Sequence, residues 1–323
     1  MIWRTLASNL AFIALALLAF AALTFWRAGH VERRIERVHP PRGRIVQVRD
    51  GEVHVVQRGT GPDLVLLHGA LTNLKDFPES LLVPLSQSYR VTLMDLPGHG
   101  YSTRQKRVST PKAQATALAD AAAILALRAP IVLGHSYGST VALAWALSGT
   151  ALPVRPSALV LIAPPMLPEP IAAPWLRKLF RLRLARRTIA TFATAWTPNA
   201  FLHLGLDHAF APQHRPKGYI RHAGTRLLLR RANFRANAEQ VAVLGAALRR
   251  LAPSYPSLAL PVEILHGTAD GVVPQAELLA ALVAQIPGAR LTLLPGVGHM
   301  PHYGDPEPIL AAVSRVAALA LPV

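Results

Sequence analysis

Short apolar runs rich in β-branched residues recur along the chain from residue 44 onward. Such runs predict buried strands, here at 63–67, 90–93, 131–133, 157–162, 262–265 and 290–294. Intervening stretches of high helix propensity predict helices at 110–128, 139–147, 274–286 and 306–319. Asp50-Gly51 joins two further runs, 44–48 and 52–58, into a predicted hairpin. Strands that alternate with helices imply an α/β fold, with a mostly parallel sheet flanked by helices and an antiparallel hairpin at its start.

The N-terminal segment has a different pattern, because residues 6–26 are almost wholly apolar. A helix of this length could cross the ~30 Å hydrocarbon layer of a membrane. Trp3 and Trp26 stand where interfacial aromatic residues are found. A cleaved signal peptide is the alternative, but the run is long and no convincing cleavage site is followed by a mature start. The pattern therefore predicts a transmembrane anchor over residues 1–28 and a linker over 29–43.

The arginines on either side of this segment predict its orientation. Only Arg4 precedes the apolar run, whereas four arginines follow it closely, at Arg27, Arg33, Arg34 and Arg37. The positive-inside rule therefore favours a single-pass membrane protein with residues 44–323 on the cytoplasmic side.

Composition narrows the possible partners. The 323 residues carry 34 Lys+Arg against 17 Asp+Glu, a formal net charge of +17. This excess fits an anionic partner such as a membrane surface, or a bias of codon usage toward arginine. The sequence has no Lys/Arg-rich motif with interleaved aromatic residues, so nucleic acid is not an expected partner. The absence of cysteine excludes disulfides, thiolate chemistry and cysteine-based metal sites, and leaves the compartment open.

The strongest chemical signal is Gly134-His135-Ser136-Tyr137-Gly138, which lies between a predicted strand and a predicted helix. A turn this sharp strains its apex residue and brings neighbouring chain close, so glycine is needed on both sides. The Ser136 hydroxyl would then stand at the carboxyl end of a central strand, facing the N-terminus of the next helix. The partial positive charge there favours an oxyanion, so Ser136 is the predicted nucleophile.

A serine nucleophile needs a base, and the base needs a group that orients it. His299 and Asp270 each follow one of the last two predicted strands, so their loops open at the same end of the sheet as Ser136. His302 is a rival base, and Asp207 and Asp305 are rival acids.

These motifs resemble those of the α/β-hydrolase superfamily, in the group with His-Gly after the third strand and a cap between strands six and seven. The resemblance covers about residue 44 to the C-terminus apart from the cap, and it rests on Leu67-His68-Gly69-Ala70, Asp95-Leu96-Pro97-Gly98-His99-Gly100, the serine motif, Asp270 and His299. It implies an oxyanion hole formed by the backbone N–H groups of Ala70 and Tyr137, and a structural role for Asp95. It implies neither a metal nor an organic cofactor.

The cap is expected at 166–256, between two parts of the core at 44–165 and 257–323. Two arginine-rich runs lie within it, at 175–187 and 221–235. Basic helices with leucine and aromatic residues can lie in a membrane interface, and the alternative is a solvated face of a lid.

Together these features predict a membrane-anchored serine hydrolase that cleaves a small-molecule carboxylic ester with an apolar acyl chain. Amide, thioester or C–C hydrolysis and acyl transfer are alternatives, because they use the same triad. A non-catalytic binding protein on the same fold is an alternative from another class.

Overall fold

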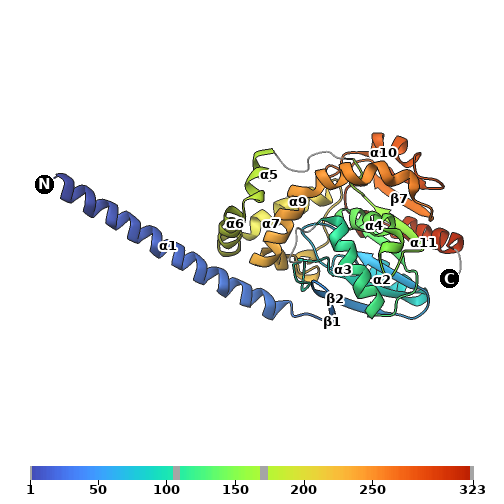
Figure 1. The fold of residues 1–323 in the computed structure, drawn as a ribbon, viewed down its shortest axis with the longest axis horizontal. Helices are drawn as coiled ribbons and strands as arrows, with labels where there is room; N and C mark the ends of the chain where they lie inside the picture. The colour runs from blue at the N-terminus through green and yellow to red at the C-terminus, as the bar shows by residue number, and fades with distance from the viewer. Residues whose placement is uncertain (1, 105–109, 168–173, 321–323) are drawn as a thin grey trace.

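A computed structural model describes residues 2–104, 110–167 and 174–320, and its core is an eight-stranded sheet (Figure 1). The strand order is β1-β2-β4-β3-β5-β6-β7-β8. The strands are β1 (Arg44–Val48), β2 (Gly51–Arg58), β3 (Asp63–Leu67), β4 (Arg90–Met94), β5 (Ile131–His135), β6 (Ala158–Ile162), β7 (Val262–Gly267) and β8 (Arg290–Leu294). The pairs β1–β2 and β2–β4 are antiparallel and all the others are parallel. The predicted α/β fold, with its parallel sheet and opening hairpin, is confirmed.

Helices cover both faces of the sheet. The central strands β3, β5 and β6 are therefore buried along their whole length. One face packs against α3 (Pro111–Ile124), α4 (Tyr137–Leu147) and α10 (Ala276–Val283). The other packs against α2 (Glu79–Ser88) and α11 (Glu307–Leu319). Helix α2 was not predicted from the sequence, where Pro84 interrupts its pattern. The resulting three layers hold the loops at the carboxyl ends of the parallel strands in fixed positions.

Helix α3 is shorter than its predicted range of 110–128. It begins as expected, since the Thr110 hydroxyl accepts a hydrogen bond from the Ala113 amide at 3.2 Å. It ends at Ile124 because Ala126 takes a left-handed conformation, with φ 52°, which no α-helix can continue.

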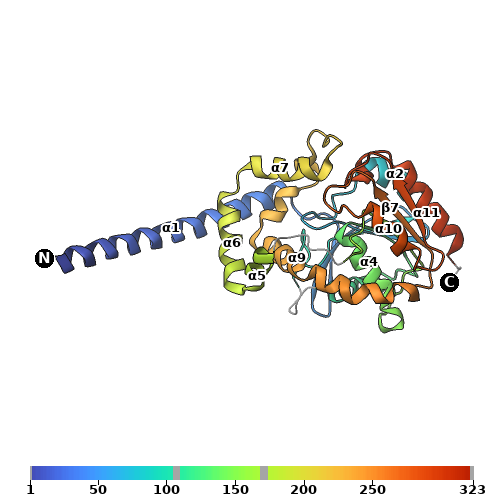
Figure 2. The same cartoon turned by 90° about the horizontal axis from the view of Figure 1, so that it is seen from above.

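The chain between β6 and β7 forms a separate group of helices, which we call the cap (Figure 2). Its α-helices are α5 (Pro174–Arg181), α6 (Arg183–Trp196), α7 (Asn199–Phe210), α8 (Tyr219–His222) and α9 (Arg231–Leu251). The basic run 175–187 is divided between α5 and α6 at Leu182, which is extended. Residues 168–173, at the start of the predicted cap, lie outside the described residues.

The N-terminal segment is one helix, α1 (Ile2–Val38), which projects from the body of the molecule (Figure 1). It is long and apolar enough to cross a membrane, and its most apolar stretch is unburied. The predicted linker at 29–43 is wrong for residues 29–38, which are helical. The reason is tertiary, because this half of α1 packs against the cap with Ile35 buried and Glu32 and Glu36 paired with cap arginines. The helix ends before Pro40 and Pro41, as proline dictates.

Asp95, at the end of β4, ties three segments together from a position 1% exposed. Its carboxylate accepts hydrogen bonds from the Leu74 amide at 2.8 Å, the Tyr101 amide at 2.9 Å and His54 Nδ1 at 2.7 Å. Burial raises the pKa of Asp95, but the hydrogen bond from His54 and nearby charge outweigh it and hold that pKa below its usual 3.8. The carboxylate is therefore a structural anion, and it belongs to the interior of the fold.

Replacing this anion should destabilise the protein. We expect Asp95→Asn to lower the free energy of unfolding by about 3–5 kcal/mol at pH 7, because donors arranged for a buried anion then face an amide. A folded-state pKa below the unfolded one contributes stability above the unfolded value and loses it as the pH falls. The difference from the natural protein should therefore persist from pH 7 to about pH 5 and shrink below about pH 4. Unfolding curves across this range test it, with Asp120→Asn on α3 as the charge-matched control, and an equal effect of the two variants contradicts it.

Candidate active site

Ser136 occupies a sharp turn between β5 and α4. Its backbone angles, φ 51° and ψ −119°, lie where non-glycine residues are rarely found. A side chain at Gly134 would overlap the backbone of Ser139, and one at Gly138 would overlap the carbonyl oxygens of Leu67 and His68. The two glycines therefore allow α4 to turn back tightly over β3 and β5 and leave the Ser136 hydroxyl at the end of the strand, as the sequence predicted.

Three predicted site residues come together in one chain of hydrogen bonds. His299 Nε2 lies 3.0 Å from Ser136 Oγ, and His299 Nδ1 lies 2.8 Å from Asp270 Oδ2. Ser136 follows β5, Asp270 follows β7 and His299 follows β8. These strands are parallel, so the three loops open at one edge of the sheet. A serine hydroxyl, an imidazole and a carboxylate in this order can transfer a proton from the hydroxyl to the imidazole.

Asp270 is held as an oriented anion. Its second oxygen, Oδ1, accepts hydrogen bonds from the amides of Val272 and Val273 at 2.9 and 2.8 Å. Burial raises the pKa of Asp270, but the hydrogen bond and charge of His299, together with the Val273 amide, lower it below its usual value. Asp270 therefore stays ionised at neutral pH and fixes the imidazole of His299 with Nδ1 protonated and Nε2 facing Ser136.

The rival base and acids lie outside this chain. His302 is buried in η4 (Pro301–Tyr303), where its Nε2 donates to the backbone carbonyl of Asp76 at 3.1 Å. Asp207 is exposed and pairs with Arg215. Asp305 accepts a hydrogen bond from the Glu307 amide at the entry to α11, at 3.0 Å. None of the three reaches Ser136 or His299 by a hydrogen bond within the described residues.

The loop after β3 carries Ala70, which lines the same cavity as Ser136, and Tyr137 is the first residue of α4. The loop is tight, since a side chain at Gly69 would meet the Cβ of Ser136 at 3.3 Å. The cap contributes to its position through Asn237 of α9, whose Oδ1 accepts a hydrogen bond from the Leu71 amide at 2.8 Å. Nothing in the local sequence singles out Asn237, because its partner lies 166 residues away.

A cavity of about 350 Å³ opens onto Ser136 and His299 between the core and the cap. Its lining is mainly apolar, with contributions from α7, α9 and the loop after β7, and includes Phe201, Leu202, Leu206, Leu228, Val241, Leu244, Val272 and Met300. The volume and lining suit a small molecule with an apolar portion.

Comparisons with known proteins agree with this architecture. A family model described as "Alpha/beta hydrolase family" matches residues 64–312. A pimeloyl-[acyl-carrier protein] methyl ester esterase from Nitrosomonas europaea is 31% identical over 264 residues, which cover 79% of this chain and 95% of that protein. The protein of the same name from Edwardsiella ictaluri is 31% identical over 269 residues, with 79% and 93% covered.

Two solved structures share the fold at lower identity. A thermophilic esterase from Thermogutta terrifontis has a TM-score of 0.67 and 22% identity, over 86% of this chain and 99% of that chain. A bacterial virulence factor described as a membrane phospholipase A has a TM-score of 0.64 and 21% identity, over 97% and 99%. The family match spans well over half of the residues and includes β4 to β8 and all of β3 except its first residue. This chain belongs to the alpha/beta hydrolase family.

Proposed function

We propose that the protein is a serine esterase that cleaves carboxylic esters through an acyl-enzyme. The observation that carries this proposal is the hydrogen-bonded chain from Asp270 through His299 to Ser136, in which Ser136 and His299 line an apolar cavity. Membership of the family and the esterase names of its relatives support ester hydrolysis.

The proposed reaction has two halves. His299 accepts the proton of the Ser136 hydroxyl as its oxygen attacks the ester carbonyl, and then returns that proton to the departing alcohol. Water, deprotonated by the same imidazole, hydrolyses the acyl-enzyme in the second half. The Ala70 and Tyr137 amides are proposed to hold the oxyanion, and the N-terminus of α4 adds partial positive charge there.

The proposed substrate is a small-molecule ester with an apolar acyl chain. The lining offers hydrocarbon contacts on several sides, and burying each CH₂ group contributes about 0.8 kcal/mol. The relatives from Nitrosomonas europaea and Edwardsiella ictaluri are named for a methyl ester on an acyl group that a carrier protein holds. They support the ester bond and the acyl chain of the proposed substrate, although their own acyl group is attached to a protein. Amide, thioester or C–C hydrolysis, acyl transfer and non-catalytic binding remain alternatives on the same geometry.

We also propose that α1 anchors the protein in a membrane as a single span, with residues 44–165 and 257–323 as the core and 166–256 as the cap. The apolar part of α1 is unburied, whereas its second half is fixed to the cap. Arg231 pairs with Glu32 at 2.6 Å and Arg27 donates to the carbonyl of Ala195 at 2.7 Å. A signal peptide is cleaved from the mature protein, so it would make no lasting contacts with the cap. These contacts therefore favour an anchor that stays attached. The fold of the membrane phospholipase A aligns over 97% of this chain, so that likeness extends into α1.

The position of α1 brings the cap close to the proposed membrane surface. Trp196 of α6 stacks on Phe20 and its indole N–H donates to Thr24, so this end of the cap lies beside the apolar part of α1. The arginine-rich run at 175–187 is only partly available to lipid. The Arg186 side chain donates to the backbone carbonyl of Phe180 and pairs with Glu239 at 3.8 Å. Arg183 and Arg187 are exposed, and they are the proposed contacts with anionic headgroups.

The first test concerns the nucleophile. Ser136→Ala should reduce kcat for a chromogenic ester by roughly 10³-fold or more while leaving the unfolding midpoint within a few degrees. Labelling by a fluorophosphonate probe should be lost in parallel. A folded Ser136→Ala protein that keeps its activity contradicts the mechanism, and a natural protein that neither reacts with the probe nor cleaves esters favours the binding alternative.

The second test concerns the base and the orienting acid. We expect His299→Ala to reduce kcat nearly as much as Ser136→Ala, and Asp270→Asn to reduce it less, because the imidazole survives without its fixed tautomer. The exposed residues His203 and Asp305 provide matched controls, and His203→Ala and Asp305→Asn should stay within about threefold of the natural protein. A reversed ranking of kcat rejects the assignment.

The third test concerns the membrane. The full chain should remain with membranes after alkaline carbonate extraction, whereas a variant lacking residues 1–26 should be released. That variant should still bind anionic vesicles at low salt, and its binding should fall above ~0.15 M, where the Debye length is ~8 Å.

In the same background, Arg183→Gln with Arg187→Gln should weaken vesicle binding at least severalfold and spare hydrolysis of a soluble ester. Arg249→Gln with Arg250→Gln, at the far end of α9, is the matched control. If the two double variants bind vesicles equally, Arg183 and Arg187 form a solvated face of the cap and do not contact the membrane.

A further inference from the structure

Arginine side chains surround a cavity of about 480 Å³ on the side of the cap that faces α1. Its walls come from α1, α6 and the start of α9, and Figure 2 shows α6 lying across α1. The cavity shares no lining residue with the one that opens onto Ser136. The charged residues that line it are Arg187, Arg230, Arg231, Arg235, Glu32 and Glu36.

The two carboxylates at this cavity are already engaged. Glu32 accepts hydrogen bonds from the backbone amide and the side chain of Arg231, and Glu36 pairs with Arg230 at 3.0 Å. Burial raises the pKa of Glu32, but the hydrogen bonds and charge of Arg231, with the charge of Arg230, outweigh it and hold that pKa below its usual value. The surroundings of Glu32 are therefore strongly positive.

Arg187 and Arg235 are left without a carboxylate. Neither side chain forms an ion pair within the part of the chain that the structure describes, and Glu239, one turn further along α9, is held by Arg104 at 2.6 Å. Burial lowers the pKa of Arg235, and the positive charges of Arg187, Arg104 and Arg231 lower it further. A half-buried guanidinium among like charges is unfavourable unless an anion joins them.

The start of α9 adds to this positive potential. Arg231 is the first residue of this 21-residue helix, and its N-cap residue, Arg230, forms no side-chain cap. The N-terminus of a helix carries about half a positive elementary charge, of which Glu32 meets a part. A phosphate group beside Arg235 would gain from this charge and from guanidinium N–H groups, which bind phosphate in pairs.

The cavity lies where the apolar part of α1 ends. Phe25 lines it, is 65% exposed and belongs to the last turn of the apolar run 6–26. The guanidinium of Arg231 lies over the Phe25 ring, 4.9 Å from its centre. In the proposed membrane arrangement, the arginines therefore lie at the depth of the lipid headgroups, with hydrocarbon beside Phe25. A phospholipid reaches this place from within the bilayer, whereas a folded acidic protein would first have to displace lipid.

We propose that this cavity binds the phosphate of an anionic membrane phospholipid. Arg187 and Arg235 would hold the phosphate oxygens, and the acyl chains would extend past Phe25 along the apolar part of α1. Bound there, the lipid would join α1, α6 and α9 and hold the cap in one orientation to the membrane. The site presupposes the proposed anchor in α1, whereas it does not depend on the esterase reaction.

The test is a titration with short-chain phospholipids. The full chain, with Ser136→Ala to keep the lipid intact, is held in a non-ionic detergent and titrated calorimetrically with dihexanoylphosphatidylglycerol. Binding should be saturable and roughly tenfold or more tighter than that of dihexanoylphosphatidylcholine, whose choline cation would face the arginines. Inorganic phosphate should also bind roughly tenfold or more weakly, because it lacks the acyl chains.

Arg235→Gln in this background should weaken the binding of dihexanoylphosphatidylglycerol by about fivefold or more. The melting temperature of the lipid-free protein should stay the same or rise, because the variant removes a charge that its neighbours repel, whereas loss of a merely structural arginine would lower it. Arg249→Gln, at the far end of α9, makes the same change of net charge and should bind like the chain with Ser136→Ala alone.

Equal binding by the Arg235→Gln and Arg249→Gln variants overturns the proposal. So does equal binding of the two phospholipids, which places the lipid in the apolar cavity at Ser136, or of inorganic phosphate, which identifies a site for free anions. The comparison of the three probes still decides the matter if Arg235→Gln does not fold. The titration needs neither a bilayer nor catalysis, so failure of the anchor in carbonate extraction, or of ester hydrolysis, would be seen separately.

Discussion

The structure depends above all on the turn at Ser136. A non-glycine residue with φ 51° costs about 1–3 kcal/mol, and the surrounding chain must hold it there. The Ser136 amide donates to the carbonyl of Ile162 at 2.8 Å, so the ladder between β5 and β6 continues into the strained residue. On the other side, Gly138 lets α4 approach the end of β3. The turn is thus fixed by its two neighbouring strands, β3 and β6. The parallel strands β7 and β8 then bring Asp270 and His299 to the same edge of the sheet.

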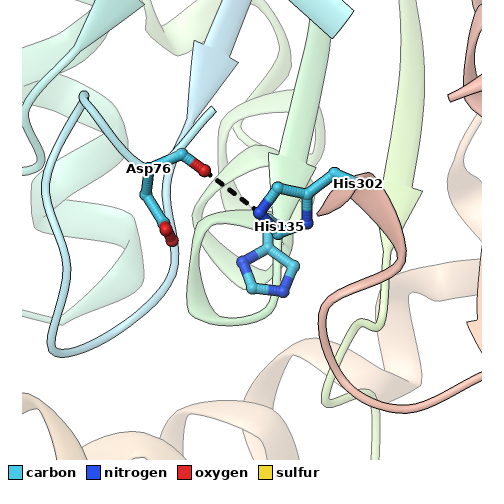
Figure 3. A group of neighbouring side chains, drawn as sticks. All are labelled: Asp76, His135 and His302. Atoms are coloured by element: carbon cyan, nitrogen blue, oxygen red, sulfur yellow. Dashed lines mark hydrogen bonds between the residues drawn. The ribbon is translucent and has the colours of Figure 1, made fainter. Parts of the chain in front are cut away.

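The buried polar side chains of His135, which adjoins this turn in the sequence, and His302, which adjoins it in the fold, are a second feature on which the site depends. Burial lowers the pKa of both His135 and His302, the latter to about 3, so both rings stay neutral at ordinary pH. Each neutral imidazole donates one N–H to a backbone carbonyl, His135 to that of His299 and His302 to that of Asp76 (Figure 3). A purely apolar interior would leave these two carbonyls without a donor. The same neutrality keeps positive charge away from His299, whose proposed role requires it to accept a proton. The Nδ1 atoms of both rings and Asp76 Oδ2 are left without a hydrogen-bond partner among the described residues.

The third feature is the attachment of α1 to the cap. Contacts within the second half of α1 combine a buried apolar side chain, Ile35, with ion pairs to Arg230 and Arg231. Arg230 also donates to the carbonyl of Gly100 at 2.7 Å, in the segment after β4. The N-terminal helix, the cap and the core are therefore linked by one residue. In the proposed arrangement, an anchor in the bilayer would hold the cap, and with it the mouth of the apolar cavity, close to the membrane surface.

The sequence by itself determined the strands, the antiparallel hairpin, the turn at Ser136 and the family resemblance, because these depend on local periodicity and on glycines that a tight turn requires. It also pointed to Asp270 and His299, since parallel strands bring their following loops to one edge. It did not predict that residues 29–38 are helical, because their stability comes from Arg230 and Arg231, some 200 positions away. Nor could it pair Asp76 with His302, or Asn237 with Leu71. Such pairs have no period and no fixed spacing, so only the folding of distant segments onto one another decided them.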